Sequence, residues 1–268
     1  MKIVGIPTLS DNYTWVIQNK NPQPAAQAWV VDPGEAAPVV RYFQDHNLEL
    51  AGILITHHHY DHVEGVADVI NALGQAPVYG NSEGPFKGIT HPVMEGDHLE
   101  ILGESFQVIA TPGHCPEHIT FYHPQALFCG DVLFTGGCGK IWDFPPELMT
   151  HSLLTLRNLP DQCQVYCGHE YTYANVKFAT LAEPNNTAIQ KRLNTVTQHT
   201  QMQQPCVPAP LGLEKQTNPF LRFDQPDLKA SLIKRGADAT SPTSLFATLR
   251  AWKDQCDAAG ILEMDDHD

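Results

Sequence analysis

Short runs of aliphatic and aromatic residues recur along the first part of the chain, each bounded by glycine, proline or polar residues. Their lengths are typical of β-strands, and the runs are KIVGI, YTWVIQ, AWVVD, GILIT, FQVIA, ITFYH, ALFCG and QVYCG. Between them lie segments whose apolar residues recur at intervals of three and four, as in amphipathic helices: APVVRYFQDH, VEGVADVINALG and PPELMTHSLLTLRNL. The alternation predicts an α/β fold with helices packed on a sheet.

The strand signal fades after about residue 173. Helical patterns follow in NVKFATLAEP, NTAIQKRLNTVTQHTQMQ, PDLKASLIKRG and SPTSLFATLRAWKDQCDAAG, and the proline-rich segment PCVPAPLGLEKQTNPF reads as a connector between them. Ser241 and Pro242 have the residue types of a helix N-cap and first helical position. We therefore expect a catalytic domain over residues 1–173 and a helical domain over residues 174–268.

The composition narrows the class of protein. Hydrophobic residues make up 42% and charged residues 17% of the chain, as in globular proteins, and no window approaches the roughly 18 apolar residues of a membrane span. The N-terminus has no secretory signal pattern, and the seven cysteines are scattered, which favours reduced thiols. We expect a cytoplasmic monomer that binds no membrane. The formal charge of −14, without a Lys/Arg-rich block, argues against nucleic-acid binding.

Metal-competent side chains follow four of the predicted strands. GILIT runs into the segment HHHYDH, which begins at His57, FQVIATPG runs into His114, ALFCG into Asp131, and QVYCG into His169. Because strand ends at one edge of a sheet lie close together, these residues can converge on a single site. Imidazole and carboxylate groups are ligands that zinc, iron and manganese accept.

The number of ligands favours two ions, because one tetrahedral ion takes about four. The first ion can take His57, His59 and His114, the second Asp61, His62 and His169, with Asp131 as the bridge. We expect His58, which lies between two ligands, to point away. Asp32 follows the strand AWVVD and could be an eighth ligand, but a structural role in the Asp-Pro-Gly turn is favoured. We expect zinc, with iron or manganese as alternatives.

These residues carry a family resemblance. THHHYDH matches the T-H-x-H-x-D-H signature of the metallo-β-lactamase superfamily, and ATPGH, CGD and YCGHEYT resemble its later motifs. Within the superfamily the chain resembles glyoxalase II, the hydroxyacylglutathione hydrolases, through GCGK, YCGHEYTYANVKFA, EPNN, NPFLR and LRAWKDQ. The resemblance implies an αββα sandwich with a C-terminal helical domain, a dinuclear metal centre, and hydrolysis of S-D-lactoylglutathione to D-lactate and glutathione in methylglyoxal detoxification.

The resemblance also implies a set of substrate contacts. Matched by motif, the residues that bind glutathione are Lys140, Tyr171, Arg250 and Lys253. Arg250 and Lys253 are three apart on a predicted helix, so both can face one way. The motifs depart from the family pattern at Trp142, where relatives have an aromatic hydroxyl, and at Cys115 and Glu117 in TPGHCPEH. We expect Cys115 and Glu117 to lie outside the ligand set.

In the mechanism that we expect, a hydroxide that bridges two metal ions attacks the thioester carbonyl. Asp61 and Asp131 are the candidate catalytic residues, and Asp61 orients the hydroxide or accepts its proton. Three alternatives stay open: an iron-dependent glutathione-persulfide dioxygenase, a lactonase of the same superfamily, and a catalytically silent metal-binding protein. The complete second ligand set favours hydrolysis over the one-iron dioxygenase.

Overall fold

The computed structural model describes residues 1–21 and 25–264. Within these residues, two mixed sheets of six strands each form the centre of the molecule. The first sheet has the order β1(Lys2–Thr8), β2(Asn12–Gln18), β3(Ala26–Val31), β4(Leu48–Leu54), β5(Val78–Gly80), β6(His91–Pro92). The second has the order β14(Ala209–Pro210), β13(Gln164–Cys167), β10(Ala126–Gly130), β9(Ile119–His123), β8(Glu104–Ala110), β7(His98–Ile101).

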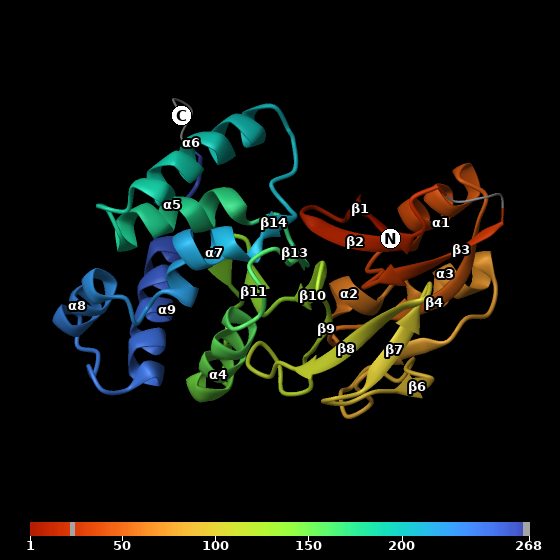
Figure 1. The fold of residues 1–268 in the computed structure, drawn as a ribbon, viewed down its shortest axis with the longest axis horizontal. Helices are drawn as coiled ribbons and strands as arrows, with labels where there is room; N and C mark the ends of the chain where they lie inside the picture. Colours follow the sequence, from red (N-terminus) through yellow and green to blue (C-terminus); the bar gives the residue numbers. More distant parts are fainter. Residues whose placement is uncertain (22–24, 265–268) are drawn as a thin grey trace.

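The two sheets pack face to face with helices outside them, which confirms the αββα sandwich (Figure 1). Along β2, Trp15 and Ile17 join the core between the sheets, whereas Val16 joins a second core under α1(Ala36–Asp45) and α3(Val66–Leu73). Every residue of β2 is buried, because both faces of the strand are covered. This explains why the central strands read as continuous apolar runs rather than alternating ones.

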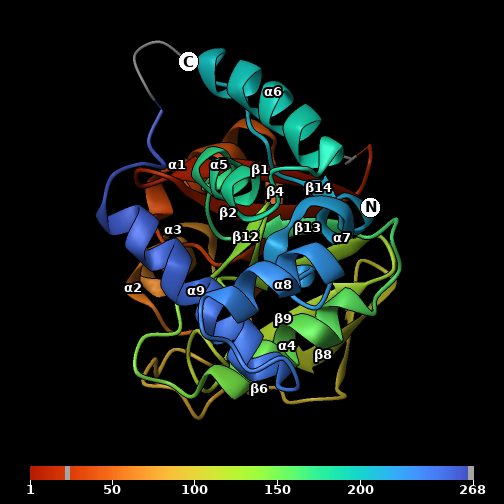
Figure 2. The ribbon, with the colours of Figure 1, turned by 90° about the vertical axis from the view of Figure 1, so that its left-hand side faces the viewer.

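The C-terminal helices lie to the left of the sandwich in Figure 1 and face the viewer in Figure 2. Most of their buried apolar side chains belong to the same core cluster as those of the sandwich. The helices are α5(Thr172–Ala182), α6(Thr187–Gln201), α7(Leu211–Thr217), the 3-10 helix η1(Pro219–Leu221), α8(Pro226–Lys234) and α9(Pro242–Ala258). Helix α9 packs on α4(Pro146–Arg157), which covers the second sheet. Among the described residues, no helix combines the length and the apolar character that crossing a bilayer requires.

Several short elements differ from the sequence-based expectation. The proline-rich connector contains α7, η1 and β14, and β14 pairs with β13 through Ala209 and Val165. A single-turn helix α2(Tyr60–Val63) and a small hairpin of β11(Leu133–Phe134) and β12(Gly137–Cys138) were also not predicted. Elements of two to seven residues are stabilised by their tertiary partners rather than by local pattern, so the sequence periodicity does not reveal them.

Candidate metal centre

The four strands that precede the predicted ligands end at one place in the sandwich. Strands β8 and β10 are both antiparallel to β9, and β13 is parallel to β10, so these three point the same way. His114, Asp131 and His169 follow their ends, and His57 follows β4 of the other sheet. The sequence predicted a single sheet edge; the structure instead brings together the edges of two packed sheets.

The first group consists of His57, His59 and His114. Their ligand atoms all lie within 4.8 Å of one another. His59 Nδ1 is 3.1 Å from His57 Nε2 and 2.9 Å from His114 Nε2. Three ring nitrogens therefore face a common point.

The second group consists of Asp61, His62 and His169, again with ligand atoms within 4.8 Å of one another. Asp61 Oδ2 is 3.6 Å from His62 Nε2 and 3.3 Å from His169 Nε2. Asp61 and His62 come from the single turn of α2, whereas His169 follows β13. The first group thus contains His57 and His59, which are two positions apart in the sequence, and the second contains the adjacent residues Asp61 and His62.

Asp131 lies between the two groups. Its Oδ1 is 3.3 Å from His62 Nε2, and its Oδ2 is 3.2 Å from His169 Nε2 and 3.6 Å from His114 Nε2. Asp131 Oδ1 and His62 Nε2 are buried and have no hydrogen-bond partner among the residues that the structure describes. Buried polar atoms of this kind are rare in folded proteins, and a cation between them would satisfy both.

The outward ring nitrogens show that the inward ones are available to a cation. His114 Nδ1 donates to the Lys140 carbonyl at 2.9 Å, so in the neutral ring Nε2 keeps its lone pair. His62 Nδ1 is 3.0 Å from Asp32, and His169 Nδ1 is 2.7 Å from Asp11. Carboxylates and carbonyls behind metal-ligating histidines fix the tautomer in the same way. The donor set therefore fits two divalent cations.

Several residues that support the centre were not predicted from the sequence. Asn12 donates from Nδ2 to Asp61 Oδ2 at 2.9 Å, and Asp11 holds His169. His118 is buried, bonds Thr111 Oγ1 through Nδ1 at 2.9 Å, and accepts from the Asp131 backbone N–H at 3.3 Å. Asp32, for which the sequence favoured a structural role, holds His62 and also accepts from the Thr56 backbone N–H at 2.8 Å. Asp11 and Asp32 lie behind the histidine rings, whereas Asn12 binds the Asp61 oxygen that faces the other ligands of the second group.

Two glycines allow the strand ends to approach one another. Gly130, directly before Asp131, has φ of +44°, a backbone conformation that favours glycine. Gly168, directly before His169, has no room for a side chain, because a Cβ there would contact the Asp131 carboxylate and the ring of His62. The CGD and CGH motifs thus require glycine for two different steric reasons.

Burial keeps the first group neutral. It lowers the pKa of His57 well below its usual value, lowers that of His114, and lowers that of His59 to about 4. Neighbouring imidazoles, His62 for His57 and His114 for His59, add to the effect. At neutral pH these rings are uncharged, which is the form that binds a metal.

In the second group the pKa values of the two histidines are raised instead. Burial acts to lower the pKa of His169, but the hydrogen bond and charge of Asp131, with Asp61, raise it to about 10. Burial also opposes protonation of His62, yet Asp131 and Asp32 raise its pKa well above the usual value. Asp61 and Asp131 keep low pKa values because these histidines outweigh the effect of burial. A cation would replace the protons of this group.

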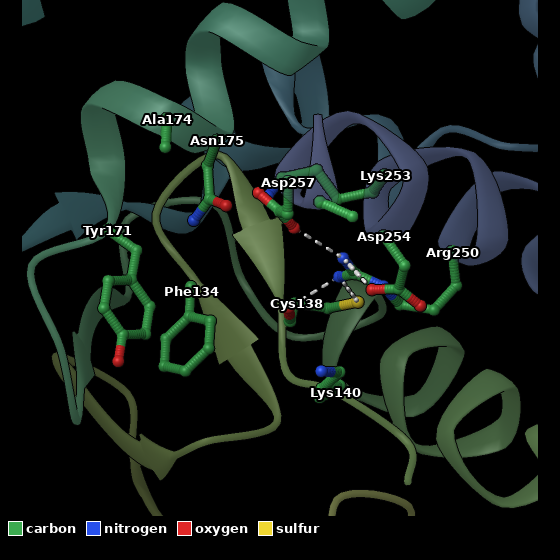
Figure 3. Close-up of a pocket in the computed structure, with 11 residues that line it drawn as sticks. Phe134, Cys138, Lys140, Tyr171, Ala174, Asn175, Arg250, Lys253, Asp254 and Asp257 are labelled. Carbon is green, nitrogen blue, oxygen red and sulfur yellow. Dashed lines mark hydrogen bonds and ion pairs between the residues drawn. The ribbon is translucent and has the colours of Figure 1, made fainter. Parts of the chain in front are cut away.

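A cavity of about 410 Å³ adjoins the centre, and all four of the predicted substrate residues line it (Figure 3). Tyr171 stacks on His169 with ring centroids 4.7 Å apart, so the cavity wall touches the second ligand group. Tyr171 and Phe134 lie on one side of the cavity and Arg250 on the other (Figure 3). Lys140 is exposed and lies over the ring of Trp142, whose side chain is 59% exposed.

The cations of α9 are paired with acidic residues of the same helix. Arg250 Nη2 is 2.9 Å from Asp254 Oδ1, and Lys253 Nζ is 2.6 Å from Asp257 Oδ1. Both cationic side chains are buried, and all four residues line the cavity. With Lys140, three cations stand against two carboxylates, which leaves one net positive charge around the cavity. The sequence did not indicate that Asp254 and Asp257 belong here.

The comparisons with known proteins agree with this geometry. The family model described as "Metallo-beta-lactamase superfamily" matches residues 9–169, and the one described as "Hydroxyacylglutathione hydrolase C-terminus" matches residues 170–256. A curated relative from Hydrogenovibrio crunogenus, named hydroxyacylglutathione hydrolase, is 62% identical over 98% of each chain.

Solved structures share the fold. The crystal structure of ETHE1 from Myxococcus xanthus matches with a TM-score of 0.63 and 24% identity, covering 94% of this chain and 98% of that one. That of TTHA1623 in a di-iron-bound form matches with a TM-score of 0.56 and 26% identity, covering 82% of this chain and 100% of that one.

Proposed function

The chain belongs to the hydroxyacylglutathione hydrolases of the metallo-beta-lactamase superfamily, and from this we propose how its residues hydrolyse the thioester of S-D-lactoylglutathione. The products are D-lactate and glutathione. The observation that carries the proposal is the cavity in which Lys140, Tyr171, Arg250 and Lys253 meet beside the candidate metal centre. Neither the persulfide dioxygenase nor the lactonase is favoured by the relatives.

The centre holds two divalent cations in this proposal. His57, His59 and His114 hold one, Asp61, His62 and His169 hold the other, and Asp131 lies between them. Bound there, the cations supply an acidified water molecule and an electrophile for the thioester carbonyl oxygen. We propose zinc as the native metal, which accepts this nitrogen and oxygen set, as iron and manganese also do.

The chain's own groups position the reacting atoms. Asn12 and the second-group histidines keep Asp61 ionised, so its carboxylate is available to orient a water molecule by accepting a hydrogen bond. Because the pKa of Asp61 is low, it orients better than it removes a proton. Asp131 is held from behind by His118 through its backbone N–H. The departing thiolate is an intrinsically good leaving group, so no dedicated general acid is required.

The cavity recognises the glutathione part of the substrate. Glutathione carries two carboxylates, which match the cations Lys140, Arg250 and Lys253 in an otherwise acidic chain. Asp254 and Asp257 hold two of these cations in place before the substrate binds. Tyr171, stacked on His169, lies between the cavity and the centre and positions the thioester.

Lys140→Gln tests this recognition, since Lys140 is exposed and its removal leaves no buried group unpaired. We expect KM for S-D-lactoylglutathione to rise roughly tenfold or more with little change in kcat, because a charge-assisted contact is lost. Lys20→Gln is the matched control, because Lys20 is also exposed and is distant from Lys140 in the sequence.

A second substrate separates the two parts of the proposal, glutathione recognition and thioester hydrolysis. The lactoyl thioester of N-acetylcysteamine lacks the glutathione carboxylates, so Lys140→Gln should not affect its hydrolysis. An unchanged KM for lactoylglutathione in the double variant Arg250→Ala with Lys253→Ala would refute the glutathione site. Absence of any thioester hydrolysis by metal-loaded protein would refute the function itself.

We also propose the cellular setting and the domain division. Seven free thiols fit a reducing cytoplasm. We propose that the protein acts as a monomer. The division into residues 1–173 and 174–268 places the junction in the first turn of α5, which begins at Thr172.

A further inference from the structure

Three residues that the metal centre and the cavity leave unused form a separate cluster. His58 turns away from both ligand groups, and its Nδ1 contacts Glu117 Oε1. Cys115 joins them, and the ligand atoms of His58, Cys115 and Glu117 all lie within 4.8 Å of one another. His58 lies between β4 and α2, whereas the other two lie between β8 and β9. Cys115 and Glu117 are the two positions at which TPGHCPEH departs from the family pattern. Both thus lie beside His58, the histidine of HHHYDH that belongs to neither ligand group.

The cluster is enclosed by the surrounding chain. Cys115 is 1% and Glu117 8% exposed, while His58 is partly open to solvent. Gly84 packs so closely on Glu117 that a Cβ there would lie 2.8 Å from Glu117 Cγ. A small cavity of about 10 Å³, lined by His58, Glu117 and Asn81, lies at the same place. It has room for about one water molecule beside His58 and Glu117.

The donor atoms define the chemistry. One imidazole nitrogen, one carboxylate oxygen and one sulfur suit a divalent cation of borderline softness, such as zinc or cobalt, and a water molecule can complete four-fold coordination. We propose that His58, Cys115 and Glu117 bind a third divalent cation of this kind. The inference does not depend on the proposed hydrolase function.

The site differs chemically from the catalytic centre, whose ligands are all nitrogen and oxygen. It also has a structural consequence. His58 lies between His57 and His59, and Cys115 follows His114 directly. A cation here ties together the two segments that supply the first ligand group.

The sulfur ligand provides the experiment. Protein whose catalytic centre is loaded with zinc is titrated with Co²⁺ and followed by near-ultraviolet absorbance, where thiolate-to-cobalt charge transfer is observed. We expect a charge-transfer band that saturates at about one equivalent, because the catalytic ligands contribute no sulfur. Cys115→Ser should remove the band. Glu117→Gln and His58→Gln should weaken the apparent affinity for Co²⁺ at least tenfold.

Cys206→Ser is the matched control, because Cys206 is the most exposed of the described cysteines and should leave the band unchanged. Circular dichroism verifies that each variant folds. If Cys115→Ser does not fold, the Co²⁺ affinity of Glu117→Gln, which retains the thiol, tests the proposal instead. Absence of the band in the wild-type protein, or its persistence in Cys115→Ser, would show that the three side chains form only a hydrogen-bonded cluster.

Discussion

A carboxylate behind the ring fixes the orientation of two candidate ligands, His62 and His169. His169 illustrates this, because Asp11 accepts from Nδ1 and leaves Nε2 to face Asp131. His62 is held in the same way by Asp32. A carboxylate behind a histidine orients the ring and strengthens it as a ligand. Asp11 is therefore a positioning residue of the second ligand group: it orients His169 and does not itself contact a cation.

Asp11→Asn tests this role. We expect the affinity of the second group for zinc to fall roughly 10- to 100-fold, while the first group binds as before. Isothermal titration calorimetry with Zn²⁺ resolves the two events, and it is carried out on metal-free protein with Cys115→Ser as the background, which removes the sulfur of the third site. Asp68→Asn, at an exposed position of α3, is the control. Equal weakening of both events, or of neither, would contradict the assignment.

The pKa of His169 predicts how pH affects the metal-free protein. Its pKa of about 10 in the fold lies above the roughly 6.5 of an unfolded chain, so the folded state binds the proton more tightly. The resulting stability is complete below about pH 6.5 and is lost as the pH rises towards 10. The Tm of metal-free protein should therefore fall between about pH 7 and 10, measured by circular dichroism.

A variant isolates this effect from other titrating groups. His169→Gln lacks the ring, so its Tm should fall less over the same pH interval. A metal-free Tm that rises with pH in the wild type would contradict the prediction. Zinc should reverse the trend, because it binds the deprotonated histidines and is favoured at higher pH.

The sequence indicated the candidate ligands more readily than the residues behind them. His57, His59, Asp61, His62 and the residues after three further strands stand in a local pattern, and the structure brings these side chains together. Asp11 and His169 are 158 positions apart, so no local pattern links them. A single histidine such as His118 has no sequence feature that reports its burial.

At the scale of elements, α9 presents the two buried cations of the cavity. Its N-cap is Ser241, whose Oγ accepts from the Ser244 backbone N–H at 3.2 Å, as the sequence predicted. Leu245, Phe246 and Leu249, on the same buried side of the helix as these cations, anchor it in the core. The position of Arg250 and Lys253 thus depends on the start of the helix and on its packing.

Ser241→Ala should destabilise the protein by about 1 kcal/mol, because the first turn of α9 loses its capping acceptor. The Tm should fall by about 2–4 °C in a protein of this size. Ser241→Asp, which retains an acceptor, should preserve most of the stability. A loss as large in Ser241→Asp as in Ser241→Ala would show that the cap is not the cause.

The long elements were predicted and the short ones were not, for a physical reason. Strands such as β2 and helices such as α6 have enough residues for a period to emerge. Strand β14 has two residues and forms only because β13 offers an unpaired edge. Likewise α7 lies in a proline-rich segment and is stabilised by tertiary contacts such as Lys215 with Asp161.

At the scale of the whole molecule, the sandwich and the C-terminal helices share one buried core. Phe178 and Phe220 of the helical part belong to the same cluster as Phe134 and Met149 of the sandwich. Arg192 of α6 bonds Glu214 of α7, and Glu214 accepts from the Gly136 backbone N–H in the β11–β12 hairpin. The two parts are therefore coupled energetically although their family models are separate.

This coupling predicts a single unfolding transition for the metal-loaded protein, because neither part can lose its structure without exposing the shared core. Trp252 lies on α9, whereas Trp15 lies in the first sheet, so fluorescence of Trp252→Phe and wild-type protein separates the two parts. Both signals should share one midpoint. Phe220→Ala, which leaves a cavity in the core and costs about 3–5 kcal/mol, should lower both midpoints equally. A lower midpoint for α9 alone would mean that the helical part unfolds independently and that the substrate cavity can be lost while the metal centre persists.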